Sequence, residues 1–95
     1  MQADLFARWG TPIERERWRR ISLCVWAYAY ELLSAPMVHD DHYDMIARQS
    51  NPTLITGRYD DWWRETFAPH TGQWIHSHPD LTGVAALHRL WTNDR

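Results

Sequence analysis

The 95-residue chain contains no lysine, and its ten basic residues are all arginines. A Schiff base or a lysyl-nucleotide intermediate needs an ε-amine nucleophile, so both kinds of chemistry are excluded. The lysine and the glycine spacing of a P-loop are also missing, and no hydrolase motif surrounds Ser34 or Ser77. These absences favour a protein that is not an enzyme.

Cysteine and long apolar runs are scarce. Cys24 is the single cysteine, so no intramolecular disulfide can form, and its apolar neighbours indicate a small buried side chain. The longest apolar segment, Leu23 to Tyr30, is too short to span a bilayer. No signal-peptide pattern opens the chain. We expect a soluble cytoplasmic protein without membrane contact.

The charge pattern gives no support for nucleic-acid binding. The net charge is −2, and a nucleic-acid footprint requires a basic patch. Arginines cluster only between Arg15 and Arg20, where Glu14 and Glu16 interleave with them. On a helix, this pattern is typical of a solvated, ion-paired face.

Tryptophan is abundant. Seven tryptophans, four tyrosines and two phenylalanines occur in the chain, and buried aromatic rings can give a small domain a dense core. The number of tryptophans exceeds what such a core usually holds. We therefore expect some of them at a surface that binds a partner, although a core position is at least as good an interpretation for any single one.

The clearest local signal opens a long helix. Thr11, Pro12 and Glu14 form a capping box with proline at the first helical position, and Ser34-Ala35-Pro36 ends the helix. The sequence predicts a helix from Pro12 to Leu33, after a lead-in whose apolar residues are Leu5, Phe6 and Trp9. Its expected core stripe has helical spacing and consists of Trp18, Ile21, Val25, Tyr28 and Leu32.

Shorter helices follow. One is expected from Asp41 to Arg48, with Asp40 or Asp41 as its cap and with Tyr43, Ile46 and Ala47 inward. Residues 53–57 read as a loop, a third helix starts at Asp60 or Asp61, and a helical turn covers residues 73–75. A last helix opens after His78-Pro79-Asp80, and its aligned apolar residues are Leu81, Val84, Leu87 and Trp91. The predicted fold is all-α: one small helical bundle over residues 1–95, with a helical hairpin at 11–49 and tryptophan-rich helices at 58–92.

Residues with chemical potential gather where the first two helices meet. The helix end, the tight link and the next helix start bring Tyr30, Asp40, Tyr43 and Asp44 near one another. An aromatic face beside two carboxylates suits the ring and ribose of a nicotinamide riboside. The alternative is that both tyrosines belong to the core and both aspartates complement the helix macrodipole.

The run from Tyr28 to Asp44 reads Y-x-Y-x-L-L-x-A-P-x-V-x-D-x-x-Y-D. It resembles, without a gap, the helical hairpin that opens bacterial NAD-dependent DNA ligases. In that family the hairpin recognises the nicotinamide mononucleotide half of NAD. The resemblance implies that Tyr30 stacks on the ring and that Asp40, Tyr43 and Asp44 form the polar set.

The chain departs from the ligase pattern at two positions. Glu31 stands where the family has His or Tyr, which adds a negative charge beside the expected ligand, and His39 replaces a proline. Both departures bear on the contact to the ligand's phosphate rather than on those to its ring and ribose. Because the catalytic lysine and the nucleotidyl-transfer domain are absent, the chain is not itself a ligase.

A second run, from Trp62 to Leu81, reads W-x-R-x-x-F-x-P-x-T-G-x-W-I-x-x-H-P-D-L. It resembles a stretch in small ligase-related proteins encoded by bacteriophages, and its last four residues are similar to the H-P-E-L of the ligases. This resemblance implies a phage protein that acts in the cytoplasm of a host cell.

Two function classes remain open. The first is a non-catalytic module that requires no cofactor and binds NAD, nicotinamide mononucleotide or a similar nucleotide, with Tyr30, Glu31, Asp40, Tyr43 and Asp44 as candidate ligand contacts. The second is a protein-interaction module that inhibits a host protein, in the manner of an anti-defence or anti-CRISPR protein, through tryptophan and arginine side chains. A zinc site built from His39, His42, His76 and His78 with nearby aspartates is the weaker alternative.

Overall fold

The computed structural model describes residues 10–93, and helices are the only regular elements in that range. They are α2 (Pro12–Leu33), α3 (Asp40–Gln49), α4 (Asp60–Thr66), the 3-10 helix η1 (Gln73–Ser77) and α5 (Leu81–Thr92). The predicted all-α fold with a long first helix is confirmed. Leu5, Phe6 and Trp9, expected to pack on the body, lie outside the described residues.

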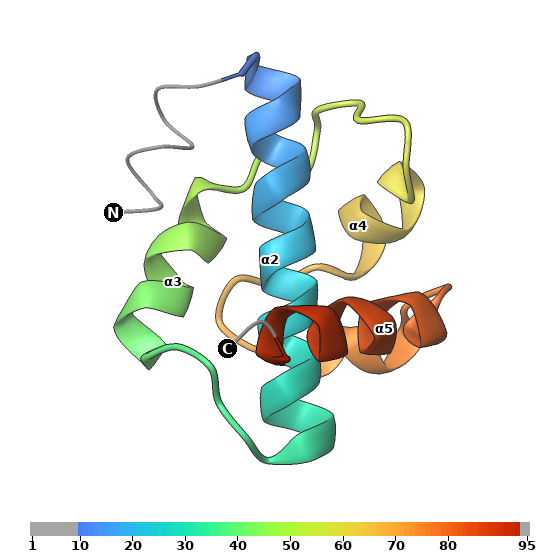
Figure 1. Ribbon diagram of the computed structural model, residues 1–95. Coiled ribbons are helices and arrows are strands. Elements are labelled where there is room, and N and C mark those ends of the chain that lie inside the picture. Colours follow the sequence, from blue (N-terminus) through green and yellow to red (C-terminus); the bar gives the residue numbers. More distant parts are fainter. Residues whose placement is uncertain (1–9, 94–95) are drawn as a thin grey trace.

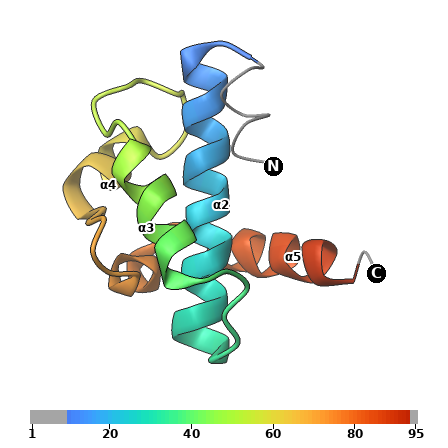
Figure 2. The ribbon, with the colours of Figure 1, turned by 90° about the vertical axis from the view of Figure 1, so that its left-hand side faces the viewer.

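The long helix α2 is the axis of the molecule. Figure 1 shows α3 on one side of α2 and α4 on the other, with α5 crossing α2 near its C-terminal half. The view in Figure 2 shows the same steep crossing from a second direction. Helix α2 packs against α3, η1 and α5, so its central turns are covered from several sides.

Helix α2 begins and ends as its sequence predicts. The Thr11 hydroxyl accepts a hydrogen bond from the Glu14 backbone N–H at 3.2 Å, and the Glu14 carboxylate accepts one from the Thr11 N–H at 2.7 Å. At the other end, Ser34 adopts the left-handed conformation with φ 52°, which cannot continue a right-handed helix. The local signals therefore set both ends of α2.

The expected core stripe of α2 is only partly right. Val25 is fully buried, but Trp18 and Leu32 are 48% and 40% exposed. A single stripe describes a helix covered on one side, whereas α2 is covered on several. Burial is instead nearly continuous from residue 22 to residue 27, and the core cluster that includes this segment is Leu23, Cys24, Trp26, Ala27, Ile46, Ala47, Trp63, Trp74, Ile75 and Val84.

The shorter elements match their expected positions, with one correction at α3. The N-cap of α3 is His39, and no side chain caps the helix. Asp40 and Asp41, each expected as a possible cap, lie inside the first turn, where their charges complement the macrodipole. The cap of α5 is as expected, since the Asp80 side chain accepts from the Gly83 N–H at 3.0 Å.

Two charges of α2 are not part of the solvated face that the sequence suggests, whereas Glu14 and Arg17 are exposed as expected. Glu16 is fully buried and Arg20 is 6% exposed. The Glu16 carboxylate accepts hydrogen bonds from Arg20 Nε at 2.9 Å, from the Ser50 hydroxyl at 2.6 Å and from the Asn51 N–H at 3.0 Å. Glu16 therefore fixes the end of α3 against α2.

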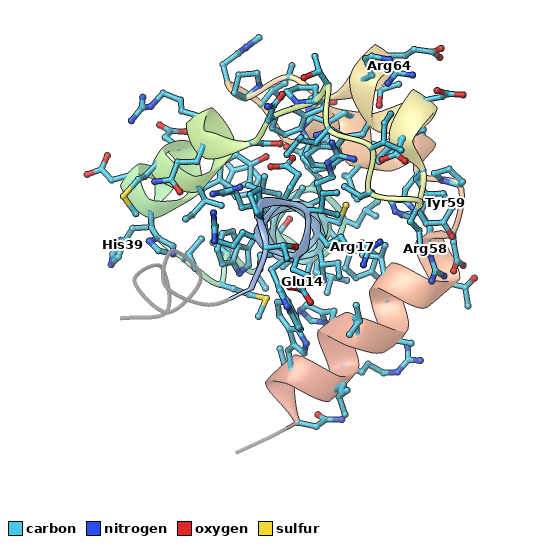
Figure 3. The ribbon with its side chains drawn as sticks, turned by 90° about the horizontal axis from the view of Figure 1, so that it is seen from above. Glu14, Arg17, His39, Arg58, Tyr59 and Arg64 are labelled. Carbon is cyan, nitrogen blue, oxygen red and sulfur yellow. The ribbon has the colours of Figure 1, made fainter. Side chains whose placement is uncertain are left out.

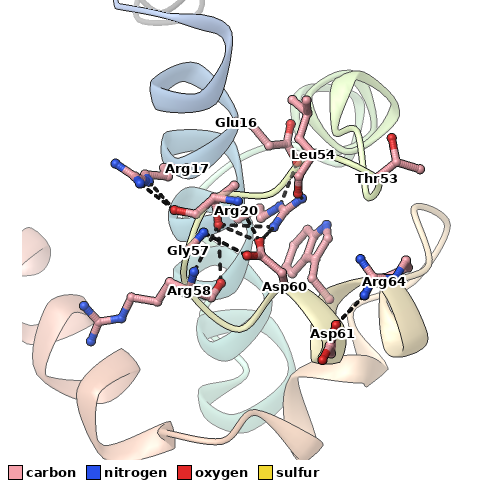
Figure 4. Close-up of polar contacts among 12 residues, drawn as sticks. Glu16, Arg17, Arg20, Thr53, Leu54, Gly57, Arg58, Asp60, Asp61 and Arg64 are labelled. Atoms are coloured by element: carbon pink, nitrogen blue, oxygen red, sulfur yellow. Dashed lines mark hydrogen bonds and ion pairs between the residues drawn. The ribbon is translucent and has the colours of Figure 1, made fainter.

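Arg20 extends this cluster to α4 (Figure 4). Its guanidinium donates to the carbonyl oxygens of Asn51 and Leu54 at 3.0 and 3.1 Å, and to Asp60 Oδ1 at 2.8 Å. The same guanidinium lies 5.5 Å from the centre of the Trp63 ring. We call Glu16, Arg20 and Asp60 the buried charge cluster. It holds the link between α3 and α4 against the middle of α2.

Asp60 carries the strongest set of hydrogen bonds in the cluster. Burial alone would raise its pKa, but the N–H and hydroxyl of Thr56, the N–H of Gly57 and the Arg20 guanidinium all donate to its carboxylate. Together they lower the pKa of Asp60 well below its ordinary 3.8. Among the described residues, no fully buried polar side-chain atom lacks a hydrogen-bond partner.

None of the helices between residues 10 and 93 has the length and apolar character needed to cross a membrane.

We expect Arg20→Met to reduce the free energy of unfolding by about 3–5 kcal/mol, because it removes the cation that pairs with both Glu16 and Asp60 and leaves the buried Glu16 with only the partly exposed Arg19 at 3.2 Å. Arg64→Met is the matched control. Arg64 pairs with Asp61 on the surface, where the side chains are 42% and 85% exposed, and such pairs contribute about 0–1 kcal/mol. Urea unfolding followed by circular dichroism measures both. Equal losses in the two variants would contradict a special role for the buried charge cluster.

The low pKa of Asp60 makes its contribution pH-dependent. Ionised Asp60 stabilises the fold fully above its unfolded pKa, and the contribution is lost as the pH falls below 3.8 toward the lowered folded value. The difference in unfolding free energy between the wild type and Asp60→Asn should therefore shrink from about pH 6 to about pH 2. A difference that stays constant over this range would show that the carboxylate charge is not what Asp60 contributes.

Candidate functional site

The candidate residues from the sequence line one pocket. Tyr30 and Glu31 come from the last turns of α2, and Asp40, Tyr43 and Asp44 come from the first turns of α3. The pocket has a volume of about 470 Å³, within the range of roughly 300–1,000 Å³ that is usual for small-molecule sites. The structure thus brings together the side chains that the sequence pattern groups.

The link between the helices forms one wall of the pocket. The left-handed Ser34 ends α2, and Pro36 next to it also lines the pocket. Met37 and Val38 are half-buried, pack against the hydrophobic core and contribute to the lining. Because these apolar side chains anchor the link, the first turn of α3 is held opposite the last turns of α2.

Three of the candidate side chains are available to a ligand. The structure gives Tyr30, Asp40 and Asp44 no side-chain hydrogen bond to any described residue, and the Tyr30 ring is 54% exposed. An exposed ring and two carboxylates without partners on one pocket are the features that a flat polar ligand requires.

Tyr43 has a structural role as well. Its hydroxyl donates to the Thr71 carbonyl at 3.1 Å. Burial is the largest cause of a strongly raised pKa at Tyr43, so its hydroxyl stays protonated and neutral. The ring therefore offers the pocket a fixed aromatic surface.

Glu31, where the chain departs from the ligase pattern, faces η1. Its side chain is 13% exposed and lies 3.8 Å from His76 Nε2. Its carboxylate also accepts a hydrogen bond from Gln73 Nε2 at 3.0 Å. Glu31 therefore joins α2 to the C-terminal half of the chain and also lines the pocket.

Sequence reasoning missed the third wall, which is formed by His70, Thr71, Gly72 and Gln73. The Thr71 carbonyl accepts from Trp74 Nε1 at 2.6 Å, and Gly72 lies so close to α2 that an added Cβ would be 3.2 Å from the Ala27 Cβ. The T-G-x-W-I stretch was the available signal, because a glycine before a buried tryptophan is typical of a close backbone approach.

The pocket is acidic. Glu31, Asp40 and Asp44 contribute three carboxylates, and no arginine is among its lining residues in the described part of the chain. Such a lining attracts a cation and repels a phosphate group. Combined with the tyrosine rings, it favours a flat ligand group that carries a positive charge.

The zinc site, which the sequence offers only as the weaker alternative, has no structural support among the described residues. Among residues 10–93, no group of three or more histidine, cysteine or acidic side chains is arranged to hold a metal ion. His42 instead contacts the Trp26 ring, with a centroid distance of 5.3 Å, and His78 contacts Trp62 at 4.8 Å.

Most of the described tryptophans belong to the core. Trp26, Trp63 and Trp74 are buried, and Trp62 and Trp91 are half-buried. The rings of Trp62, Trp63 and Trp74 form edge contacts with one another, such as Trp63 with Trp74 at 5.0 Å. For these residues the core interpretation describes the structure better than a binding surface does.

Comparisons with known proteins identify no matching family model, no similar curated protein and no similar solved structure. The resemblance to the ligase hairpin therefore stays a prediction from the residues themselves.

The close approach of Gly72 to Ala27 yields a test of the third wall. We expect Gly72→Ala to reduce the free energy of unfolding by about 1–3 kcal/mol, because the added methyl group crowds the Ala27 methyl group. The cost should be smaller in an Ala27→Gly background, where that space is free. Urea unfolding of the four chains measures the coupling, and equal costs in both backgrounds would contradict this contact.

Proposed function

We propose that this protein is a non-catalytic module that binds the nicotinamide riboside half of an NAD-derived nucleotide. The observation that carries the proposal is the shared pocket of Tyr30, Asp40, Tyr43 and Asp44, which are the positions that the ligase resemblance implies. In this role the protein would sequester or sense such a nucleotide in the cytoplasm of a host cell.

The chemistry of the oxidised nicotinamide ring supports this choice. The ring is a flat pyridinium that carries a positive charge when it is joined to ribose. The face of Tyr30, the ring of Tyr43 and the carboxylate of Asp44 all stabilise such a cation, because aromatic faces and carboxylates both present negative charge. The reduced ring is neutral and loses this attraction.

The acidic pocket suits the ribose of the ligand but not its phosphate. The carboxylates of Asp40 and Asp44 can accept hydrogen bonds from ribose hydroxyls, and such charge-assisted bonds are strong. The phosphate would find no arginine in the pocket and would meet Glu31. We therefore place the phosphate at the mouth, in solvent, so that the riboside provides most of the affinity.

A host protein as the partner remains the alternative. Tryptophan and arginine anchors would have to be exposed for that role, whereas three of the described tryptophans are buried. The exposed Trp18, at 48%, is the tryptophan that favours it.

Calorimetric titration tests the proposed function. Nicotinamide riboside, nicotinamide mononucleotide and NAD should all bind, the riboside at least as tightly as the mononucleotide, and ADP-ribose should not. Asp44→Asn should weaken the binding of the riboside by about tenfold, since a hydrogen bond to a charged group contributes about 1.5–3 kcal/mol.

Two controls sharpen this titration. Asp41→Asn removes a carboxylate from the same helix turn but outside the pocket lining, so its affinity should equal that of the wild type. Reduced NAD should bind more weakly than NAD because its ring is neutral. Absence of heat with all nicotinamide compounds would refute the proposed function and restrict the resemblance to the fold.

A further inference from the structure

A second and larger pocket lies on another side of α2. Its volume is about 570 Å³, and it is bounded by α2, the loop before α4, α4 itself and the segment that leads into α5. It shares no lining residue with the acidic pocket. Nothing in the proposed function uses it.

The floor of this second pocket is apolar. It consists of Ile21, Cys24 and Val25 on α2 and of Val84 and Leu87 on α5. Burial raises the pKa of the Cys24 thiol to about 12, so this side chain is a neutral part of the floor. A ligand must therefore place an apolar body here.

Aromatic rings form the wall. The His78 ring lies 5.2 Å from the Tyr59 ring and 4.8 Å from the Trp62 ring, both edge-on. The Trp62 indole is held by a hydrogen bond from its Nε1 to the Ser77 hydroxyl at 3.0 Å. Fixed rings at edge-to-face geometry favour another flat ring as their partner.

Arg17 and Arg58 line the pocket and are exposed, so they lie at its mouth; Figure 3 shows both on the side of the molecule that carries Tyr59. The Arg58 guanidinium lies 5.6 Å from the Tyr59 ring centre and has no hydrogen-bond acceptor among the described residues. Arg17 donates to the Thr56 carbonyl through Nε and Nη2, and its Nη1 makes no hydrogen bond to a described residue. The mouth therefore offers guanidinium N–H donors to an anion.

The remaining polar groups do not cancel this positive charge. Arg20 is neutralised within the buried charge cluster. Asp80 lines the pocket and caps α5 through the Gly83 N–H, and its carboxylate offsets one of the two positive charges of Arg17 and Arg58. Burial lowers the pKa of His78, and its Nδ1 accepts from the Asp80 N–H at 2.8 Å. Neutral His78 therefore carries its proton on Nε2, as a further donor.

The loop that carries Tyr59 is held in an uncommon conformation. Tyr59 has φ 56°, in the left-handed region that a bulky residue rarely adopts. The Asp60 carboxylate fixes this loop through the N–H groups of Thr56 and Gly57. Backbone in such a conformation, held by its surroundings, is a common feature of ligand sites.

We propose that this second pocket binds a small aromatic monocarboxylate. The ring lies on the apolar floor against Trp62, and the carboxylate pairs with Arg58 and the free N–H group of Arg17 at the mouth. A planar guanidinium matches a carboxylate with two parallel hydrogen bonds, and the cavity volume suits a single-ring acid with a short linker rather than a peptide.

The test is a titration of the isotope-labelled protein with 3-phenylpropionate, followed by amide and indole NMR shifts. The acid should shift the Trp62 indole N–H and the backbone amides of Val84 and Leu87. The neutral amide of the same acid, 3-phenylpropanamide, should bind about tenfold more weakly, since it keeps the ring and loses the charge. Equal affinities of acid and amide would overturn the proposal.

Two variants and one competition locate the binding. Arg58→Gln should reduce the affinity for the acid by about tenfold, whereas Arg48→Gln, an exposed arginine of α3 outside both pockets, should not. Leu87→Trp should fill the floor and abolish binding.

Saturating nicotinamide riboside should leave the affinity for 3-phenylpropionate unchanged, since the two pockets share no lining residue. Shifts confined to the acidic pocket, or no shifts at millimolar acid, would also overturn the proposal.

Discussion

The arrangement of this small domain depends on the ion pair between Glu16 and Arg20. The two side chains are four residues apart on α2 and form a buried contact at 2.9 Å. Through hydrogen bonds to Ser50, Asn51 and Asp60, they also hold the end of α3, the following loop and the start of α4. Burying charges costs desolvation energy, which the pairing offsets only when the remaining donors and acceptors are satisfied. Among the described residues, every fully buried polar side-chain atom has a hydrogen-bond partner. We infer that the cluster fixes the path of the link between α3 and α4, which has few buried apolar side chains of its own.

Both pockets are built on α2, the helix that carries Glu16 and Arg20. Successive residues of a helix are rotated by about 100°, so Ile21 and Val25 face one side while Ala27 and Tyr30 face another. The loop that the buried charge cluster holds forms the mouth of one pocket, and the α2–α3 link forms a wall of the other. A rigid central helix covered from several sides thus separates two cavities within one small domain.

Local sequence signals predicted the elements well, and tertiary features poorly. The capping box at Thr11 and the proline at Pro36 specify α2 by short-range chemistry, so its bounds follow from a few neighbouring residues.

Glu16 and Arg20 have the spacing of an ordinary surface pair, and their burial depends on a loop that lies more than thirty positions away, at Asn51 and Leu54. The core stripe of α2 failed for the same reason, since periodicity assumes that a helix is covered on one side. The grouping of Tyr30 with Asp40, Tyr43 and Asp44 was predictable because a tight link joins them. The wall at Gly72 had the T-G-x-W-I stretch as its one signal, and the second pocket is lined by segments that are far apart in the sequence.

The two pockets differ in charge, and this difference limits what each can bind. One contains the carboxylates of Asp40 and Asp44, and the other has Arg17 and Arg58 at its mouth. A nucleotide presents both a cationic ring and an anionic phosphate, so an acidic pocket can hold the ring only if the phosphate stays outside. An aromatic acid presents an apolar ring and one anionic end, which suits an apolar floor beneath a basic mouth and not the acidic pocket. Under the two proposals, charge sorts ligands of similar size between the two sides of α2, even though aromatic rings line both pockets.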